Sequence, residues 1–135
     1  MSNRAMKPGT IGWQDLTVPN APEVRDFYQA VVGWDVRGED MGGYEDYHMI
    51  SKATGQSAAG ICHARGVNAD VPSQWLVYIV VEDVARSCAT CAERGGKVVA
   101  GPRMMGGGRF AVIQDPAGAT CALYAPPQES KSSPS

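Results

Sequence analysis

The sequence predicts an α+β fold built from two tandem βαβββ modules. One observation is that strand-like and helix-like segments occur in the order βαβββ and then repeat that order. Another is that the glycines expected to end the two helices, Gly33 and Gly96, lie 63 residues apart. The same offset, without gaps, aligns four further pairs: Val18 with Val81, Asn20 with Asp83, Val36 with Val99 and Gly55 with Gly118. Because a recurring offset indicates internal duplication, we predict two copies of one unit.

The first module opens with a strand, a helix and the start of a second strand between Gly12 and Val36. Asn20 is the expected helix N-cap, and Glu23, three residues later, completes a capping box. Gly33 takes the position where a left-handed residue ends a helix. Apolar residues at helical spacing lie between the cap and the glycine: Val24, Phe27, Tyr28 and Val31.

Three further strands complete the first module, at about 34–37, 44–51 and 58–63. The middle one alternates in character, with Tyr47 and Met49 on one side and His48 on the other. This alternation predicts that His48 faces solvent, opposite Tyr47 and Met49. Residues 64–73 are polar and rich in turn formers, which predicts a linker between the modules.

The second module begins with the clearest strand of the sequence, Trp75 to Val81, whose apolar run predicts burial on both faces. A helix over 84–94 follows, and then strands at about 97–100, 109–114 and 119–124. Between the first two of these strands, Gly101 to Gly108 forms a loop. Its Gly106–Gly108 part is either a lid, with Met104 and Met105 as its apolar surface, or an ordinary hairpin. We expect one domain over 11–126, with modules at 11–63 and 74–126, a flexible leader over 1–10 and a disordered tail over 127–135.

Composition limits the classes of partner. The 135 residues carry a net charge of −2 without charged blocks, so nothing favours nucleic acid or an anionic membrane. No apolar run approaches the roughly 20 residues that span a bilayer, and no secretion signal is recognised, which predicts a cytoplasmic protein. The four cysteines are expected to be free thiols, including the Cys88 and Cys91 pair within the second helix.

The motifs together resemble the vicinal oxygen chelate superfamily, which groups glyoxalase I, bleomycin-resistance proteins and extradiol dioxygenases. The resemblance covers about Ile11 to Pro126 and is greatest for its glyoxalase-like members. Its pieces are Trp13-Gln14-Asp15-Leu16-Thr17-Val18, Phe27-Tyr28 with Gly33-Trp34, Glu82-Asp83-Val84 with Gly95-Gly96, and Gly108-Arg109-Phe110 with Asp115-Pro116-Ala117-Gly118-Ala119. It implies a curved mixed sheet around a cavity, and pairing of chains as a homodimer.

The resemblance also implies four inward positions that usually hold a divalent metal. Carried over by motif, these are Trp13 and Leu76 on the first strands of the modules, and Ala59 and Ala122 on the last. None of the four side chains can coordinate a metal, and the sequence has only two histidines, His48 and His63. We therefore expect no metal and no other cofactor.

Strand alternation in phase with Trp13 selects the side chains that would line a metal-free cavity. They are Trp13, Asp15, Leu76, Tyr78, Ala122 and Tyr124, joined by Tyr47 and Met49 from the third strand. This set describes either an aromatic ligand pocket or a filled core. Asp15 is the candidate catalytic residue, as a general base, or else a structural carboxylate bonded to a backbone amide or to Arg109.

Two classes of function follow. The first is a metal-independent protein, similar to bleomycin-resistance proteins, that binds a small apolar or aromatic molecule. The alternative is a lyase or isomerase that uses Asp15 and a tyrosine for acid-base chemistry, with a metal-dependent glyoxalase as a third reading. In each case the partner is a small molecule rather than nucleic acid or a membrane.

Overall fold

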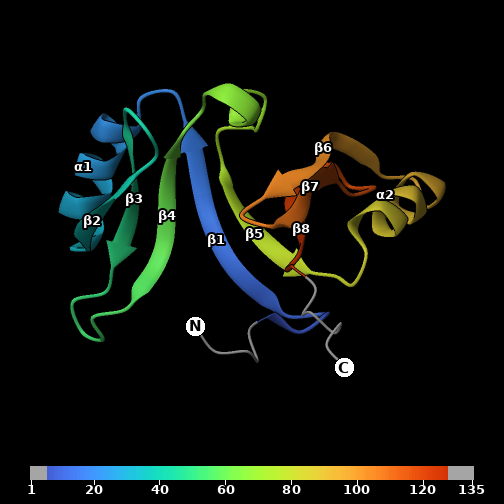
Figure 1. The fold of residues 1–135 in the computed structure, drawn as a ribbon, viewed down its shortest axis with the longest axis horizontal. Coiled ribbons are helices and arrows are strands. Elements are labelled where there is room, and N and C mark those ends of the chain that lie inside the picture. The colour runs from blue at the N-terminus through green and yellow to red at the C-terminus, as the bar shows by residue number, and fades with distance from the viewer. Residues whose placement is uncertain (1–5, 128–135) are drawn as a thin grey trace. The chain divides into compact units, whose positions relative to one another are not determined.

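The computed structural model describes residues 6–127 (Figure 1). The first βαβββ series is β1 (Ile11–Val18), α1 (Ala21–Val32), β2 (Asp35–Asp40), β3 (Glu45–Ile50) and β4 (Ser57–His63). After the short 3-10 turn Gly66–Asn68, the second series is β5 (Trp75–Val80), α2 (Val84–Glu93), β6 (Lys97–Met105), β7 (Gly108–Gln114) and β8 (Thr120–Ala125). The predicted α+β class and its repeated element order are therefore confirmed.

The chain divides into two compact units. Trp13–Leu76 forms one, which we call the first unit, and the described residues before and after it form the second unit. In the second unit the backbone of Val80 exchanges hydrogen bonds with Gly9 and Thr10, which precede β1. The rest of the predicted leader, residues 1–5, and the predicted tail from residue 128 onward lie outside the described residues.

The first unit has the strand order β2-β3-β4-β1. β1 runs parallel to β4, whereas the other neighbours are antiparallel. The register places Leu16 beside Ile61 and Ile61 beside Tyr47, so these three side chains share one face of the sheet. α1 packs against β2, β3 and β4 on that face (Figure 1).

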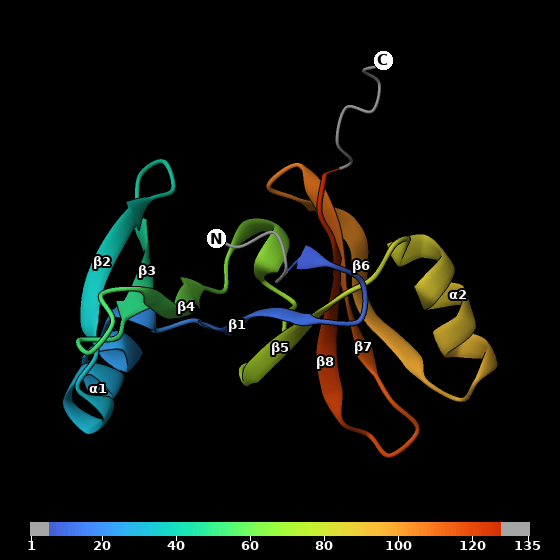
Figure 2. The ribbon, with the colours of Figure 1, turned by 90° about the horizontal axis from the view of Figure 1, so that it is seen from below.

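The second unit repeats this plan with the order β5-β8-β7-β6. β5 runs parallel to β8, which places Tyr78 beside Ala122 and Val80 beside Tyr124. α2 packs against β6, β7 and β8 (Figure 2). The expected loop before β7 is shorter than predicted, because β6 continues through Met104 and Met105. Gly106 and Gly107, with φ of 58° and 89°, form the two-residue turn of a hairpin.

The helix ends differ in part from the prediction. Asn20 makes no side-chain cap; its amide instead donates to the Glu23 carboxylate at 2.9 Å, so the predicted capping box is wrong. Gly33 ends α1 as expected, with φ of 85° and its N–H donated to the carbonyl of Gln29. In α2 the Asp83 side chain accepts the backbone N–H of Arg86 at 3.0 Å, which is a true N-cap.

The gapless 63-residue offset holds for the helix starts and for the turn glycines Gly55 and Gly118, but it is wrong at the helix ends and along the last strands. α1 has 12 residues and α2 has 10, and the left-handed glycine after α2 is Gly95 rather than Gly96. On the last strands the counterpart of Ala122 is Gly60, since Gly60 pairs with Asp15 as Ala122 pairs with Tyr78. The pairing of β3 with β4 shifts after Met49, and such a bulge moves residues from one face to the other.

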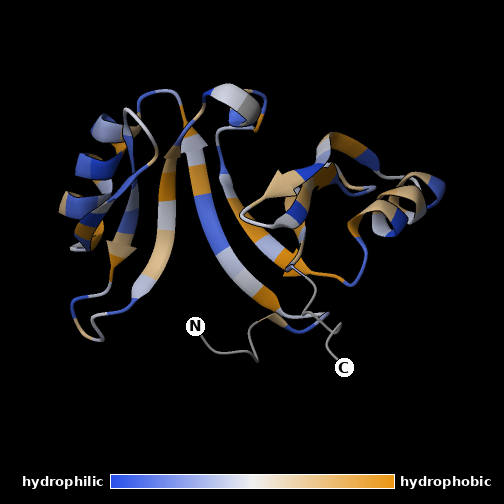
Figure 3. Ribbon diagram, in the orientation of Figure 1, coloured by the Kyte–Doolittle hydropathy of each residue, from blue (hydrophilic) through white to orange (hydrophobic). Residues whose placement is uncertain are grey.

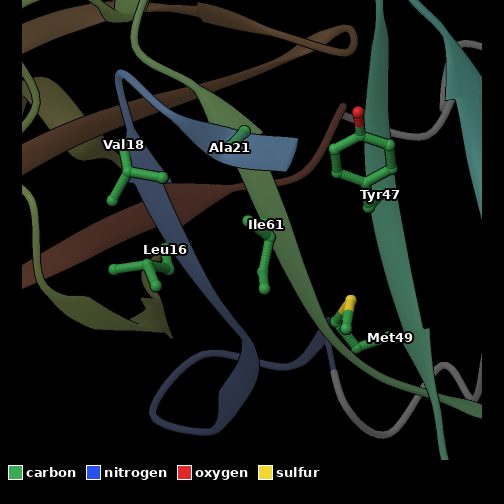
Figure 4. Close-up of a cluster of buried hydrophobic side chains, with 6 residues drawn as sticks. All are labelled: Leu16, Val18, Ala21, Tyr47, Met49 and Ile61. Atoms are coloured by element: carbon green, nitrogen blue, oxygen red, sulfur yellow. The ribbon is translucent and has the colours of Figure 1, made fainter. Parts of the chain in front are cut away.

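A buried cluster joins α1 to the first unit's sheet (Figure 4). Ile61 of β4 lies between the β1 pair Leu16 and Val18 and the β3 pair Tyr47 and Met49. Figure 3 shows a hydrophilic stretch in the middle of β1 with hydrophobic residues on either side of it. Leu16 and Val18 of β1 face α1, and successive side chains of a strand point to opposite faces. The other face of β1 therefore carries Trp13, Asp15 and Thr17.

Candidate functional site

Trp13, Asp15, Gly60 and His48 share the face of the first unit's sheet that is opposite α1, which we call the Trp13 face. Asp15 pairs with Gly60 across β1 and β4, and His48 pairs with Gly60 across β3 and β4. A Cβ atom added at Gly60 would lie 3.2 Å from the Asp15 Cβ and 3.5 Å from the Trp13 Nε1. The indole of Trp13 thus lies over the bare backbone of Gly60, and it stays partly exposed.

The His48 ring lies near the indole of Trp13. The two ring centroids are 6.3 Å apart with an interplanar angle of 60°. The Nε2 of His48 lies 2.6 Å from the Oε1 of Glu39, and its Nδ1 lies 3.4 Å from the Ser57 hydroxyl. The register confirms that His48 lies opposite Tyr47 and Met49, but its side chain is only 27% exposed and contacts Glu39 and Ser57 instead of facing solvent alone.

Cys62 lies on the same face, two residues after Gly60 on β4, where it pairs with Thr17 of β1. Its thiol donates to the Oδ2 of Asp15 at 3.9 Å. Burial, followed by the negative charges of Asp15 and Asp46, raises the pKa of the Cys62 thiol far above its ordinary value. A thiol held protonated in this way is a weak nucleophile, so Cys62 is a hydrogen-bond donor to Asp15 rather than a reactive cysteine.

Asp46 and His63 form a second, largely buried pair at the edge of this face. The Oδ1 of Asp46 accepts the backbone N–H of His63 at 2.9 Å and lies 3.1 Å from its Nδ1. Tyr44 packs edge-on against the His63 ring and carries the Arg65 guanidinium over its face at 3.9 Å. These contacts hold the His63 ring in place between Asp46 and Tyr44.

Asp15, the candidate catalytic residue, is only 5% exposed. It contacts the Cys62 thiol and lies beside Gly60, with Trp13 two residues earlier on the same face. A carboxylate in such a place is able to hold a ligand hydroxyl or amine, or to act as a base. Its catalytic role stays a prediction.

Tyr47 and Met49 do not lie with Trp13, so their predicted place in the pocket is wrong. Both belong to the cluster with Leu16, Val18 and Ile61, against which Tyr28 and Trp34 pack. The physical reason is that side chains alternate between the two faces of a strand. Alternation separates Tyr47 from His48 correctly, but the pairing of β3 with β4 decides which of the two faces α1.

The remaining predicted site residues are buried or partly buried. Leu76 belongs to the first unit and is fully buried. In the second unit Tyr78, Ala122 and Tyr124 share one face, through the pairing of β5 with β8, and the Tyr78 ring lies 6.5 Å from that of Phe110. Burial raises the pKa of Tyr124, whose hydroxyl would lie 2.8 Å from a Cβ added at Gly108.

The positions implied for a metal do not fit one. Trp13, Leu76 and Ala122 have no ligating atom, and the register places Gly60, not Ala59, beside Asp15. Ala59 instead pairs with Met49, away from the Trp13 face. Within residues 6–127, no group of three or more His, Cys, Asp or Glu side chains is arranged to hold a metal ion.

Two open grooves lie in the second unit, away from the predicted residues. One, of about 330 Å³, runs along α2 and is lined by Arg86, Ser87, Thr90, Cys91, Arg94, Ile113 and Leu123. The other, of about 340 Å³, lies at the hairpin turn between β6 and β7 and includes Met104 and Arg109. No predicted site residue lines either groove.

Sequence reasoning missed His48, Glu39, Ser57 and Gly60. The signal for His48 was present in the alternation of β3, and only the choice of face was wrong. Glu39 and Ser57 carry no motif and come close to His48 only through strand pairing.

Neither α1 nor α2, nor any other helix in the part of the chain that is described, is long and apolar enough to cross a bilayer.

Comparison with known proteins places this arrangement in a family. The family model of the Glyoxalase/Bleomycin resistance protein/Dioxygenase superfamily matches residues 10–123. The chain is 32% identical over 123 residues to the putative glyoxylase CFP32 of Mycobacterium tuberculosis, covering 90% of this chain and 46% of the relative. It is 30% identical over 114 residues to the anthracycline biosynthesis protein DnrV of Streptomyces peucetius, covering 83% and 40%. The chain thus spans less than half the length of these two curated relatives.

Solved structures share the fold at lower identity. A Legionella pneumophila structure titled as an NAD-dependent benzaldehyde dehydrogenase superposes with a TM-score of 0.55 at 14% identity, covering 84% of this chain and 96% of that one. A Streptomyces coelicolor methylmalonyl-CoA epimerase superposes with a TM-score of 0.54 at 16% identity, covering 89% and 96%. Such likeness supports the fold alone. The sequence match and the repeated βαβββ plan show that the chain belongs to the Glyoxalase/Bleomycin resistance protein/Dioxygenase superfamily.

Proposed function

We propose that this protein binds a small, flat, apolar or aromatic molecule against the Trp13 face without a metal ion. The observation that carries the proposal is the partly exposed Trp13 indole lying over Gly60. A flat aromatic surface over a glycine offers a stacking platform, and aromatic stacking adds about 0.5–1.5 kcal/mol beyond area burial. Asp15 and His48 supply polar groups that would orient the ligand.

Residue chemistry supports the metal-free part of the proposal. The implied ligand positions hold tryptophan, leucine, glycine and alanine, which offer no side-chain donor. Four further ligand-binding residues stay predictions: Leu76, Tyr78, Ala122 and Tyr124. Tyr47 and Met49 are not part of the proposed site, because they face α1. The relative DnrV is named for anthracycline biosynthesis, which supports an aromatic ligand class.

Alizarin, a planar dihydroxyanthraquinone, is a suitable probe. We expect calorimetric titration in buffer with EDTA to show saturable binding at one site per chain. Trp13→Leu should weaken the affinity at least tenfold, because the stacking platform is lost. Trp34→Leu is the matched control, since Trp34 packs against the α1 side of the sheet. Circular dichroism would verify that both variants are folded.

Three results would contradict this proposal. Absence of alizarin binding would contradict the proposed ligand class. Wild-type affinity in Trp13→Leu would contradict the proposed position of the site. Loss of binding after EDTA treatment, restored by a stoichiometric divalent ion, would contradict the proposal that binding needs no metal.

A second candidate function is acid-base catalysis by Asp15, as a lyase or isomerase. It is favoured by the burial of Asp15 at the sheet face that bears Trp13. Asp15→Asn distinguishes the two candidates: a binding protein would lose affinity at most, whereas an enzyme would lose turnover and keep binding.

The predicted homodimer is also part of the proposal, and the exposed Phe27 and Val31 of α1 are compatible with a second copy. Light scattering that shows only monomer at 10 μM, on the order of a weak-dimer Kd, would contradict it. The cytoplasmic location stays a prediction.

A further inference from the structure

A chain of three polar side chains crosses the first unit's sheet at His48. Glu39 comes from β2, His48 from β3 and Ser57 from the start of β4. On β2 the residue that pairs with His48 is Arg37. Glu39 lies two residues after Arg37 on the same face, and its side chain reaches the His48 ring diagonally. Glu39 and Ser57 contact opposite nitrogens of one imidazole, at 2.6 Å and 3.4 Å. We call Glu39, His48 and Ser57 the His48 relay.

The partners of His48 fix the chemical character of each ring nitrogen. An ionised carboxylate only accepts hydrogen bonds, so the proton of the neutral ring sits on Nε2, facing Glu39. The Nδ1 then carries the lone pair and accepts from the Ser57 hydroxyl. A histidine oriented by a carboxylate on one nitrogen, with a basic lone pair on the other, is arranged to take up a proton.

The position of the relay links it to the proposed ligand. His48 lies on the Trp13 face with its ring 6.3 Å from the indole, and its side chain is 27% exposed. A planar molecule stacked on Trp13 would therefore present its edge to His48 and Ser57. The Trp34 and Trp75 rings, by contrast, lie in the cluster on the α1 side of the sheet.

We propose that the His48 relay is a proton-accepting site for an acidic hydroxyl of the bound ligand, which narrows the ligand class to planar phenols. This inference rests on the proposed function of the Trp13 face. The phenolic O–H bond breaks, and a new N–H bond forms at the Nδ1 of His48, directly or through the Ser57 hydroxyl. The electron pair stays on the ligand oxygen as phenolate, and the resulting imidazolium lies between that phenolate and the Glu39 carboxylate.

Other charged groups also face the relay. Arg37 pairs with His48 on β2, Asp46 precedes it by two residues on β3, and Asp15 lies across Gly60 on β1. The carboxylates oppose formation of a phenolate, whereas Arg37 and protonated His48 favour it. Since all of these groups except His48 are retained in a His48 variant, the comparison of variant with wild type isolates the contribution of the imidazole.

The experiment follows the ionisation of bound alizarin, whose phenolate absorbs at a longer wavelength than its phenol. Wild type, His48→Gln, Glu39→Gln and His63→Gln would be saturated with alizarin in EDTA and titrated with pH. We expect the phenol bound to wild type to ionise at least one pH unit lower than in His48→Gln, a tenfold difference in the ionisation constant. Glu39→Gln, at a half-exposed position, should give an intermediate value. His63→Gln, the matched control, should behave as wild type.

The outcomes separate the two proposals. If alizarin binds His48→Gln and Glu39→Gln with wild-type affinity and wild-type ionisation, the relay inference is overturned and the binding function stands. If alizarin fails to bind wild type, or binds Trp13→Leu equally well, both are overturned. His48→Asn provides a second replacement should His48→Gln fail to fold.

Discussion

The rings of His48 and Trp13 lie 6.3 Å apart although their strands are not neighbours. β4 runs between β3 and β1, and its residue Gly60 pairs with His48 on one side and with Asp15, two residues from Trp13, on the other. Neighbouring strands are about 4.8 Å apart, so two rings on β3 and β1 must reach over the strand between them. A residue without a side chain leaves the room for that approach.

Gly60→Ala should therefore weaken ligand binding. The new methyl would lie 3.2 Å from the Asp15 Cβ and 3.5 Å from the Trp13 Nε1, so the indole must move. We expect a loss of alizarin affinity of about threefold to tenfold, which corresponds to about 0.7–1.4 kcal/mol. Gly38→Ala is the control, because the three atoms nearest to the methyl there belong to the flexible carboxylate of Glu45. Unchanged affinity in Gly60→Ala would mean that ligands do not use the indole.

Cys62 should resist alkylation at pH 9, the ordinary pKa of a cysteine thiol. Burial and then the Asp15 charge raise its pKa, so at this pH the native thiol stays protonated while an unfolded one is half ionised. Asp15→Asn removes one cause of the shift and should speed alkylation. Peptide mapping after iodoacetamide would measure the rate. Equal labelling of Cys62 in native and urea-unfolded protein would contradict the burial of this thiol.

The same shift predicts a pH dependence of stability. The folded state holds the Cys62 proton more tightly than the unfolded state, so its contribution is complete below pH 9 and declines as pH rises above that value. Urea unfolding between pH 8 and 10 should show a steeper loss of unfolding free energy in wild type than in Cys62→Ser. Parallel curves for the two proteins would contradict the assignment.

The two helix starts should respond differently to loss of their cap residues. Asp83 accepts the N–H of Arg86, and Asp83→Ala should lower the unfolding free energy by about 1 kcal/mol. Asn20 makes no such bond, so Asn20→Ala should change it by only a few tenths of a kcal/mol. Urea unfolding of both variants measures the difference, and equal losses would mean that Asn20 caps α1 in solution.

The order of elements was predictable because each depends on local pattern. Helical spacing from Val24 to Val31 predicted α1, and the apolar run at Trp75 predicted β5. Gly33 was also predictable, since a helix end with positive φ favours glycine. Such signals lie within a few residues of the feature that they specify.

The candidate site depends on pairing between strands and was predicted only in part. Alternation on β3 separated His48 from Tyr47, but it does not say which of the two faces α1. The bulge after Met49 adds one residue to β4 after its start, so Ala59 was aligned where Gly60 belongs. Trp13 and Asp15 were placed on one face because they lie two residues apart on one strand, where alternation alone decides the face.

Met49 and Trp13 allow a direct test of which face binds ligand. Met49 is fully buried in the cluster on the α1 side, so Met49→Ala should lower the unfolding free energy by about 2–5 kcal/mol and leave the alizarin affinity of the folded protein unchanged. Trp13 is partly exposed, so Trp13→Leu should have the opposite profile, a smaller loss of stability and a large loss of affinity. Urea unfolding and calorimetry on the two variants measure both quantities, with the volume-conserving Met49→Leu as the control for folding. A large loss of affinity in Met49→Ala, at near wild-type stability, would place the ligand on the α1 side instead.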